Sequence, residues 1–200
     1  MTINKLEADY LVIGAGAMGM AFVDELRKQD PQCSIVIVDR HANPGGHWND
    51  AYPFVTLHQP ALFYGVNSEP LGRGGEDLSS GAEILAYYQR VLEKMLRSGQ
   101  VKYFPQSESV GSNRFRSLLE PELEHEVLVH RKVVDATYMN VEVPSVRGPK
   151  YKVAEGTAVV PINGLANLVK PFGAYVVIGG GKTGIDAVLL LLQRGVAPDH

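Results

Sequence analysis

The stretch LVIGAGAMGMAFVDEL, Leu11–Leu26, decides the fold. A short apolar run, Tyr10–Ile13, ends at a glycine and is typical of a buried parallel strand. Residues Ala17–Lys28 then carry helical spacing, and the β-branched run Ser34–Val38 predicts a second buried strand. A strand, a helix and a strand in this order indicate a βαβ unit, the building block of α/β folds with a parallel sheet.

The glycine-rich turn inside this unit predicts a nucleotide site. Gly14, Gly16 and Gly19 have the spacing G-x-G-x-x-G, in which the first glycine permits a tight turn, the second lets backbone approach a pyrophosphate, and the third lets the helix pack on the strand. Asp39 ends the next strand, 20 residues after Gly19, where a carboxylate accepts hydrogen bonds from an adenosine ribose. Because this carboxylate would repel a 2′-phosphate, the predicted ligand of this unit is FAD or NAD.

The same pattern occurs again at Val176–Leu192, VVIGGGKTGIDAVLLLL. The preceding run AYVVI predicts a strand at residues 174–178, and the following residues predict a helix. The stretch is not an ATPase phosphate-binding loop, since Val176 stands where that motif needs its first glycine. The candidate dinucleotide contacts of this second turn are Gly179, Gly181, Lys182, Thr183 and Gly184. Solvated turn residues are the alternative interpretation of the lysine and the threonine.

Between the two turns, the sequence predicts one long loop, one helix and several short strands. The loop after Asp39 is aromatic and is interrupted by prolines, so we expect it to be irregular and functional. A helix is predicted from Ser80, which has capping-box spacing to Glu83, and it can end at Gly99. Short β segments are predicted at residues 101–105, 114–119 and 125–138.

The composition excludes several function classes. A formal net charge of -3 gives no reason to expect nucleic acid or an anionic membrane as a partner. The one cysteine, Cys33, allows neither an internal disulfide nor a C-x-x-C pair. Four histidines without metal-ligand spacing predict no metal site: His41, His47, His125 and His130. Because no run resembles a signal peptide or a membrane-spanning helix, we expect a soluble, cytoplasmic protein.

Four stretches resemble one known family, in the family's order. They are LVIGAGAMGM, VIVDRHANPGGHW, VVDATYMNVEVPS and VVIGGGKTGID, and they resemble the FAD/NAD(P)-binding oxidoreductases around the flavin-containing and Baeyer–Villiger-type monooxygenases. The resemblance implies an α/β fold: a Rossmann-like FAD-binding domain with a β-rich insertion and the start of a second Rossmann-like unit. Residues 1–170 would be the first segment of the FAD-binding domain, and residues 171–200 the beginning of an incomplete NAD(P)-binding domain.

The resemblance also implies roles for single residues. Gly14, Gly16 and Gly19 would hold the FAD pyrophosphate, and Asp39 the adenosine ribose. Gly46 and Trp48 would lie along the ribityl and flavin side, Tyr52, His58 and Gln59 are candidates around the isoalloxazine ring, and Thr137 lies on the family's Ala-Thr-Gly strand. Arg40, next to Asp39, is a further candidate cofactor contact. Trp48 and Tyr52 could instead cover the core beneath the loop, and His58 could be a hydrogen-bonded loop residue. The sequence departs from the family's pattern at two places. Tyr138 replaces the glycine of Ala-Thr-Gly, and the family's F-x-G-x-x-x-H fingerprint is missing before the second glycine turn.

Three functions follow as hypotheses. The resemblance implies an FAD-dependent oxidoreductase of monooxygenase-like type that uses NADP (or NAD), O₂ and a small organic substrate, with no catalytic acid or base assigned. The alternative is a truncated, non-catalytic FAD- or nucleotide-binding protein or gene fragment, in which a partner or missing segment covers the apolar C-terminal helix. A plain NAD-dependent dehydrogenase would leave the second glycine turn and GGHW without a purpose.

Overall fold

A computed structural model describes residues 2–137, 149–169 and 172–199. The first range holds a six-stranded sheet with the strand order β5-β2-β1-β8-β7-β6. Its strands are β1 (Thr2–Ile13), β2 (Ile35–Val38), β5 (Val101–Phe104), β6 (Ser107–Gly111), β7 (Arg114–Ser117) and β8 (Leu123–Asp135). The strands β5, β2, β1 and β8 are parallel to their neighbours in this order, and β6 and β7 add an antiparallel pair. The predicted α/β fold with a β-rich insertion is therefore confirmed.

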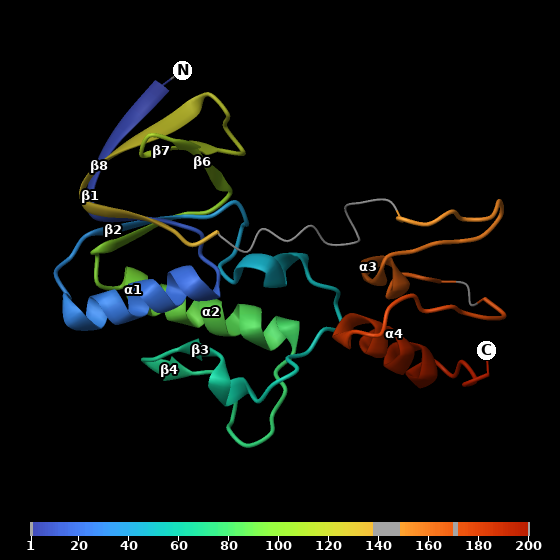
Figure 1. The fold of residues 1–200 in the computed structure, drawn as a ribbon. Helices are drawn as coiled ribbons and strands as arrows, with labels where there is room; N and C mark the ends of the chain where they lie inside the picture. Colours follow the sequence, from blue (N-terminus) through green and yellow to red (C-terminus); the bar gives the residue numbers. More distant parts are fainter. Residues whose placement is uncertain (1, 138–148, 170–171, 200) are drawn as a thin grey trace.

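Two helices, α1 (Ala17–Gln29) and α2 (Gly81–Leu96), lie side by side against one face of the sheet, as Figure 1 shows. A small hairpin of β3 (Gly65–Val66) and β4 (Glu69–Pro70) lies beyond them. The predicted capping box of α2 is present, because the Ser80 hydroxyl accepts from the Glu83 amide and the Glu83 carboxylate accepts from the Ser80 amide.

The two faces of the parallel strands build two separate cores, because successive side chains of a strand point to opposite faces. Val12 and Ile37 are fully buried toward the helices. Leu11 and Val36 are buried on the other face, together with Phe115 of β7. The antiparallel strands β6 and β7 thus cover a face that a helix covers in a simple βαβ arrangement.

Some elements differ from the sequence prediction. Strand β1 begins at Thr2, far earlier than Tyr10, because its polar first half pairs with β8. The long loop contains two short 3₁₀ helices, η1 (Gly46–Asp50) and η2 (Ala61–Phe63), besides the hairpin. Strand β6 is not among the predicted strands, because its polar residues lack the apolar alternation that indicates a strand.

The C-terminal part of the described chain contains α3 (Ile162–Leu165) and α4 (Lys182–Gln193), which pack around Leu165, Ala187 and Leu191. The helix predicted after the second glycine turn is confirmed. The strand predicted at residues 174–178 is wrong. Val176 is 87% exposed, and no segment within the described ranges pairs with this run, so its backbone has no ladder to join.

Tyr138 and residues 170 and 171, where the predicted domain boundary falls, lie outside the described residues. In the three described ranges, no helix combines the length and the apolar character needed to cross a membrane.

Candidate functional site

The site lies where the order of the sheet reverses. From β1 the chain continues to β2 and β5 on one side, and it later places β8 on the other side of β1. Because these four strands are parallel, their carboxyl ends meet at one edge of the sheet. Ligands of open α/β sheets bind in the crevice outside such a switch point. Gly14, Asp39 and Thr137 all follow strand ends at this edge.

Two glycines of the first turn, Gly14 and Gly19, have little or no room for a side chain. Gly14 has a φ of +102°, and a Cβ there would lie 3.2 Å from Thr137 Cγ2. A Cβ on Gly19 would lie 1.9 Å from the Gly14 carbonyl oxygen, so this glycine is required for the helix to approach the strand. Gly16 faces Gly46, where a Cβ would lie 2.9 Å from Gly16 Cα. Gly16 and Gly46 thus pack backbone against backbone, and no side chain covers this turn at these two positions.

The helix N-termini at the two glycine turns differ from that of α2. Helix α1 begins after Gly16 and α4 after Gly181, and neither has a side-chain cap or an acidic residue in its first turn. In α2, Ser80 and Glu83 occupy those positions. Amides at the start of α1 and α4 are therefore left for an anion, which the helix dipole also favours.

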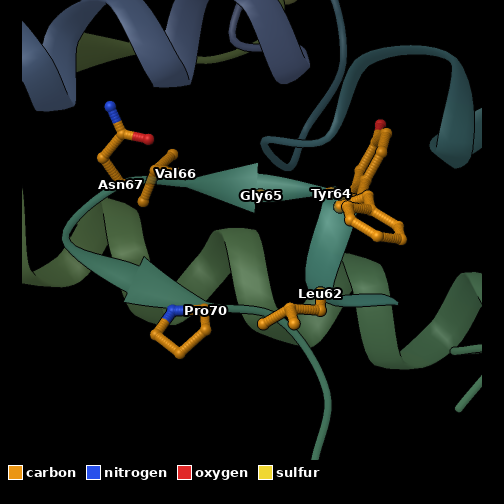
Figure 2. Close-up of a pocket in the computed structure, with 7 residues that line it drawn as sticks. Leu62, Tyr64, Gly65, Val66, Asn67 and Pro70 are labelled. Carbon is orange, nitrogen blue, oxygen red and sulfur yellow. The ribbon is translucent and has the colours of Figure 1, made fainter. Parts of the chain in front are cut away.

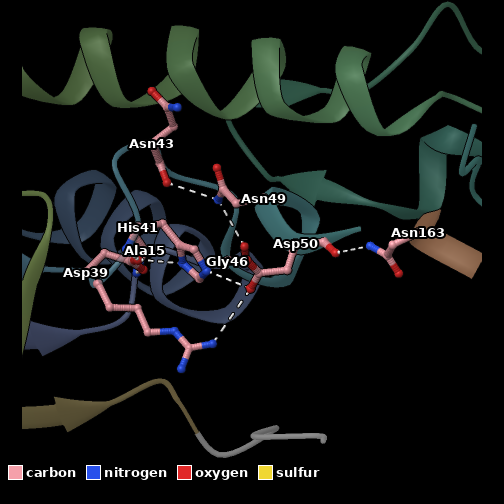
Figure 3. A network of polar contacts seen from close by, with 9 residues as sticks. Ala15, Asp39, His41, Asn43, Gly46, Asn49, Asp50 and Asn163 are labelled. Carbon is pink, nitrogen blue, oxygen red and sulfur yellow. Dashed lines mark hydrogen bonds and ion pairs between the residues drawn. The ribbon is translucent and has the colours of Figure 1, made fainter. Parts of the chain in front are cut away.

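Asp39 lies at the centre of a polar network, shown in Figure 3. Its Oδ2 accepts from the Ala15 amide at 2.6 Å, and its Oδ1 accepts from the His41 amide at 2.7 Å. The His41 ring lies with Nδ1 2.9 Å from the same Oδ1 and Nε2 2.9 Å from Asp50 Oδ2. Arg40 is largely exposed and pairs with Asp50 at 3.7 Å. The structure thus places Asp39 and Arg40 beside the first glycine turn.

Thr137 lies next to Gly14 of this turn. Its amide donates to Asp135 Oδ1 at 2.8 Å, and its hydroxyl donates to the same oxygen at 2.5 Å. These two hydrogen bonds lower the pKa of Asp135. Ala136 donates to the Ile13 carbonyl at 2.8 Å, so the end of β8 is fixed next to Gly14.

Two aromatic residues of the long loop, Trp48 and Tyr52, are buried. The Trp48 indole belongs to the core under the loop and donates to the Tyr64 hydroxyl at 2.7 Å. Tyr52 is also buried and donates to Asp186 Oδ2 at 2.6 Å. Both observations favour the core-covering interpretation of these two residues. His58 is exposed and Gln59 is half-buried, and their predicted contacts with the flavin ring stay predictions.

The second glycine turn repeats the geometry of the first. Gly179 has a φ of +125°, and a Cβ on Gly184 would lie 2.1 Å from the Gly179 carbonyl oxygen. A Cβ on Gly181 would meet open space, so this turn is not covered as the first one is by Gly46. Thr183 is exposed beside it. An open depression of about 280 Å³ is lined by Val177, Gly179, Gly180, Gly184, Ile185, Val188 and Leu189.

Lys182 does not extend freely from this turn. Its ammonium pairs with Asp186, one helical turn further along α4, and lies 3.3 Å from Thr56 Oγ1. Burial and the Asp186 carboxylate raise the pKa of Tyr52, so the phenol remains a donor to that carboxylate. This group of four residues connects the second glycine turn to the loop that follows GGHW.

Another depression, of about 410 Å³, lies on the β3–β4 hairpin (Figure 2). Its lining is Leu62, Phe63, Tyr64, Gly65, Val66, Asn67 and Pro70. It shares no residue with either glycine turn. In the part of the chain that the structure describes, no group of three or more His, Cys, Asp or Glu side chains could hold a metal ion.

Sequence reasoning missed His41 and Asp50 as parts of this site. A usable signal was present, because His41 follows Asp39 by two residues, the spacing at which an aspartate side chain accepts from the backbone. Asp50 had no such signal, since only the folding of η1 brings it to His41.

Comparison with known proteins supports this geometry. Residues 12–97 match the NAD(P)-binding Rossmann-like domain family. A flavin-containing monooxygenase of Stenotrophomonas maltophilia has a similar structure, with a TM-score of 0.51 and 25% identity over 66% of this chain and 38% of that one. The resemblance to FAD/NAD(P)-binding oxidoreductases of this group is thereby confirmed for their N-terminal portion.

Two curated relatives extend the likeness along the sequence. An uncharacterized protein of Mycobacterium tuberculosis is 48% identical over 98% of this chain and 38% of its own length. A probable FAD-binding monooxygenase of an Acinetobacter species is 26% identical over 94% of this chain and 39% of its own length. The chain thus spans less than half the length of these relatives.

Proposed function

We propose that this chain carries the FAD-binding site, and the first part of the nicotinamide-cofactor site, of an FAD-dependent, NAD(P)H-linked oxidoreductase. The proposed activity is monooxygenase-like, with a small organic substrate. The observation that carries the proposal is the tight glycine turn of Gly14 and Gly16, which lies against Gly46 and beside Asp39 at an uncapped helix N-terminus. The names of the Stenotrophomonas and Acinetobacter proteins support the flavin and the monooxygenase-like class.

Each part of the site has a defined task in this proposal. The amides at the start of α1 would bind the FAD pyrophosphate, Asp39 would orient the adenosine ribose, and Thr137 would border the pyrophosphate opposite Gly46. The α4 N-terminus would bind the phosphates of NADPH or NADH. Bound FAD would supply hydride acceptance and oxygen activation, and the protein would supply position and exclusion of water.

Location and partners belong to the same proposal. The single cysteine is buried and favours a reducing, cytoplasmic compartment. A small-molecule substrate is proposed as the partner, with neither nucleic acid nor membrane. Exposed Ile185, Leu189 and Leu192 on α4 are the surface that a partner or a further segment would cover.

The absorption spectrum of the purified chain tests this function. We expect flavin bands at about one FAD per chain. We expect Gly16→Val to abolish them, because the new side chain would lie against Gly46 and keep a pyrophosphate from the backbone of this turn. Gly173→Val is the matched control, since a Cβ at Gly173 meets open space. A colourless protein that also fails to bind added FAD would contradict the proposal.

The alternative function, a non-catalytic nucleotide-binding protein, is favoured by one observation. The run before the second glycine turn is not paired in a sheet, and Val176 and Ile178 are largely exposed. Rapid mixing of the FAD-loaded chain with NADPH or NADH separates the two functions. Bleaching of the flavin bands supports the oxidoreductase, and stable bands with FAD bound support the alternative.

A further inference from the structure

The hydrogen-bonding capacity of the Asp39 carboxylate is almost used up by the protein itself. An ionised carboxylate offers about four lone-pair sites, two on each oxygen. The Ala15 amide takes one site on Oδ2, at 2.6 Å. The amide and the Nδ1 of His41 take both sites on Oδ1, at 2.7 and 2.9 Å. One site remains, on Oδ2.

His41 is held in this position from its other side. Its Nε2 lies 2.9 Å from Asp50 Oδ2, and only 15% of its side chain is exposed. Since an ionised carboxylate has no proton to give, a ring nitrogen can only donate in these two contacts, from Nδ1 to Asp39 and from Nε2 to Asp50 when both nitrogens carry a proton. Asp50 ends the 3₁₀ helix η1, which also carries Gly46 against Gly16. The His41 ring therefore connects the Asp39 carboxylate to η1, the segment whose Gly46 lies against the glycine turn (Figure 3).

A ribose offers Asp39 two hydroxyl donors, which together need two free acceptor sites. The side chain of Asp39 is only 5% exposed. With one site left on Oδ2, the second hydroxyl finds no acceptor on this carboxylate while His41 stays in place.

We propose that His41 determines specificity at the nucleotide site by restricting Asp39 to a single hydroxyl of the adenosine ribose. This inference rests on the proposed FAD site and adds to it which hydrogen bonds the ribose can make. His41 acts through Asp39 and is a positioning residue.

Reconstitution of the FAD-free chain with FAD analogues tests the inference. The probes are FAD, FAD lacking the adenosine 2′-hydroxyl and FAD lacking the adenosine 3′-hydroxyl, and binding is followed by quenching of flavin fluorescence. For the unaltered chain, we expect one analogue to bind roughly tenfold or more weakly, since it loses a hydrogen bond to a charged group, and the other within about twofold of FAD.

Variants of His41 complete the experiment. In His41→Ala the backbone amide stays on Oδ1 and only the site held by Nδ1 is freed. That site accepts the second hydroxyl, so we expect both analogues to bind roughly tenfold more weakly than FAD. His41→Asn retains a side-chain donor and should keep the one-hydroxyl pattern. His130→Ala is the matched control, because His130 is an exposed histidine whose Nε2 lies 2.7 Å from Glu7, far along the sheet.

Each outcome has a defined meaning. Similar losses with both analogues in the unaltered chain, or losses with neither, would overturn the role of His41, as would an unchanged pattern in His41→Ala. The comparison within the unaltered chain decides the matter even where a variant fails to fold. If FAD itself does not bind, the proposed function is overturned, and the inference with it.

Discussion

His125, on β8, is a histidine that the fold surrounds with aromatic rings. Its ring stacks on Phe115 with the centroids 4.6 Å apart and lies 5.0 Å from the ring of Phe104. Its Nδ1 is buried without a hydrogen-bond partner in the described part of the chain. This burial lowers the pKa of His125 below its ordinary value of 6.5, because a charged ring would lose its hydration.

The sign of the resulting pH dependence follows from this lowered pKa. As the pH falls through 6.5, the unfolded chain binds a proton at His125 before the folded chain does, so the free energy of unfolding decreases with the pH. We expect His125→Phe to reduce the loss of stability between pH 7.5 and pH 5.5. Urea denaturation at both pH values measures it. An unchanged pH dependence in this variant would show that other groups, such as His47, whose pKa is also lowered, account for it.

Of the three longer helices, α2 contributes mainly to stability, whereas α1 and α4 have N-termini suited to binding a ligand. Helix α2 is capped by its own side chains, Ser80 and Glu83, and buries a complete apolar stripe that includes Ile84 and Val91. Helices α1 and α4 begin directly after glycines, and their first amides have no side-chain acceptors. An uncapped terminus is less stable on its own, and its first amides are left to bond to water or to a ligand.

Removing the cap of α2 should therefore cost stability without affecting the site. Ser80→Ala is expected to lower the free energy of unfolding by about 1 kcal/mol, the usual value of an N-cap, as measured by chemical denaturation. Ser80→Asp keeps a capping acceptor and should stay near the unaltered protein. FAD affinity should be the same in both variants, and a loss of more than about twofold would contradict this separation of roles.

The whole molecule is joined by a few polar contacts between its N-terminal part and its C-terminal part. Tyr52 donates to Asp186, and Asn163 Nδ2 donates to the Asp50 carbonyl at 3.0 Å. Lys182 reaches Thr56 from the second glycine turn. In the proposed function these contacts hold the second nucleotide site beside the loop that follows GGHW.

Tyr52→Phe should loosen this connection while preserving the packing of the ring. Asp186 would lose one donor and keep Lys182, so we expect a cost of about 1 kcal/mol, or roughly fivefold faster hydrogen exchange in α4. Exchange in α1 should not change. Tyr151→Phe, at an exposed position, is the control, and equal exchange of α4 in both variants would contradict the role of Tyr52.

The sequence by itself determined the elements whose signal is local. The glycines of the two turns, the capping box of α2 and the β-branched run of β2 are each required by backbone geometry or burial within a few residues. This is why the first βαβ unit and the α/β class were predicted correctly. The predicted nucleotide residues Gly14, Asp39 and Thr137 also meet at one edge of the sheet for this reason, since each follows a parallel strand.

Only the tertiary structure decided the features that depend on distant partners. The polar first half of β1 forms a strand because β8 pairs with it, whereas the apolar residues 174–178 form none because no described segment does. The same holds for His41, whose neighbours Asp39 and Asp50 meet only after η1 has folded. A hydrogen bond needs a donor and an acceptor, and the sequence does not show which distant residue folding will bring to a given group.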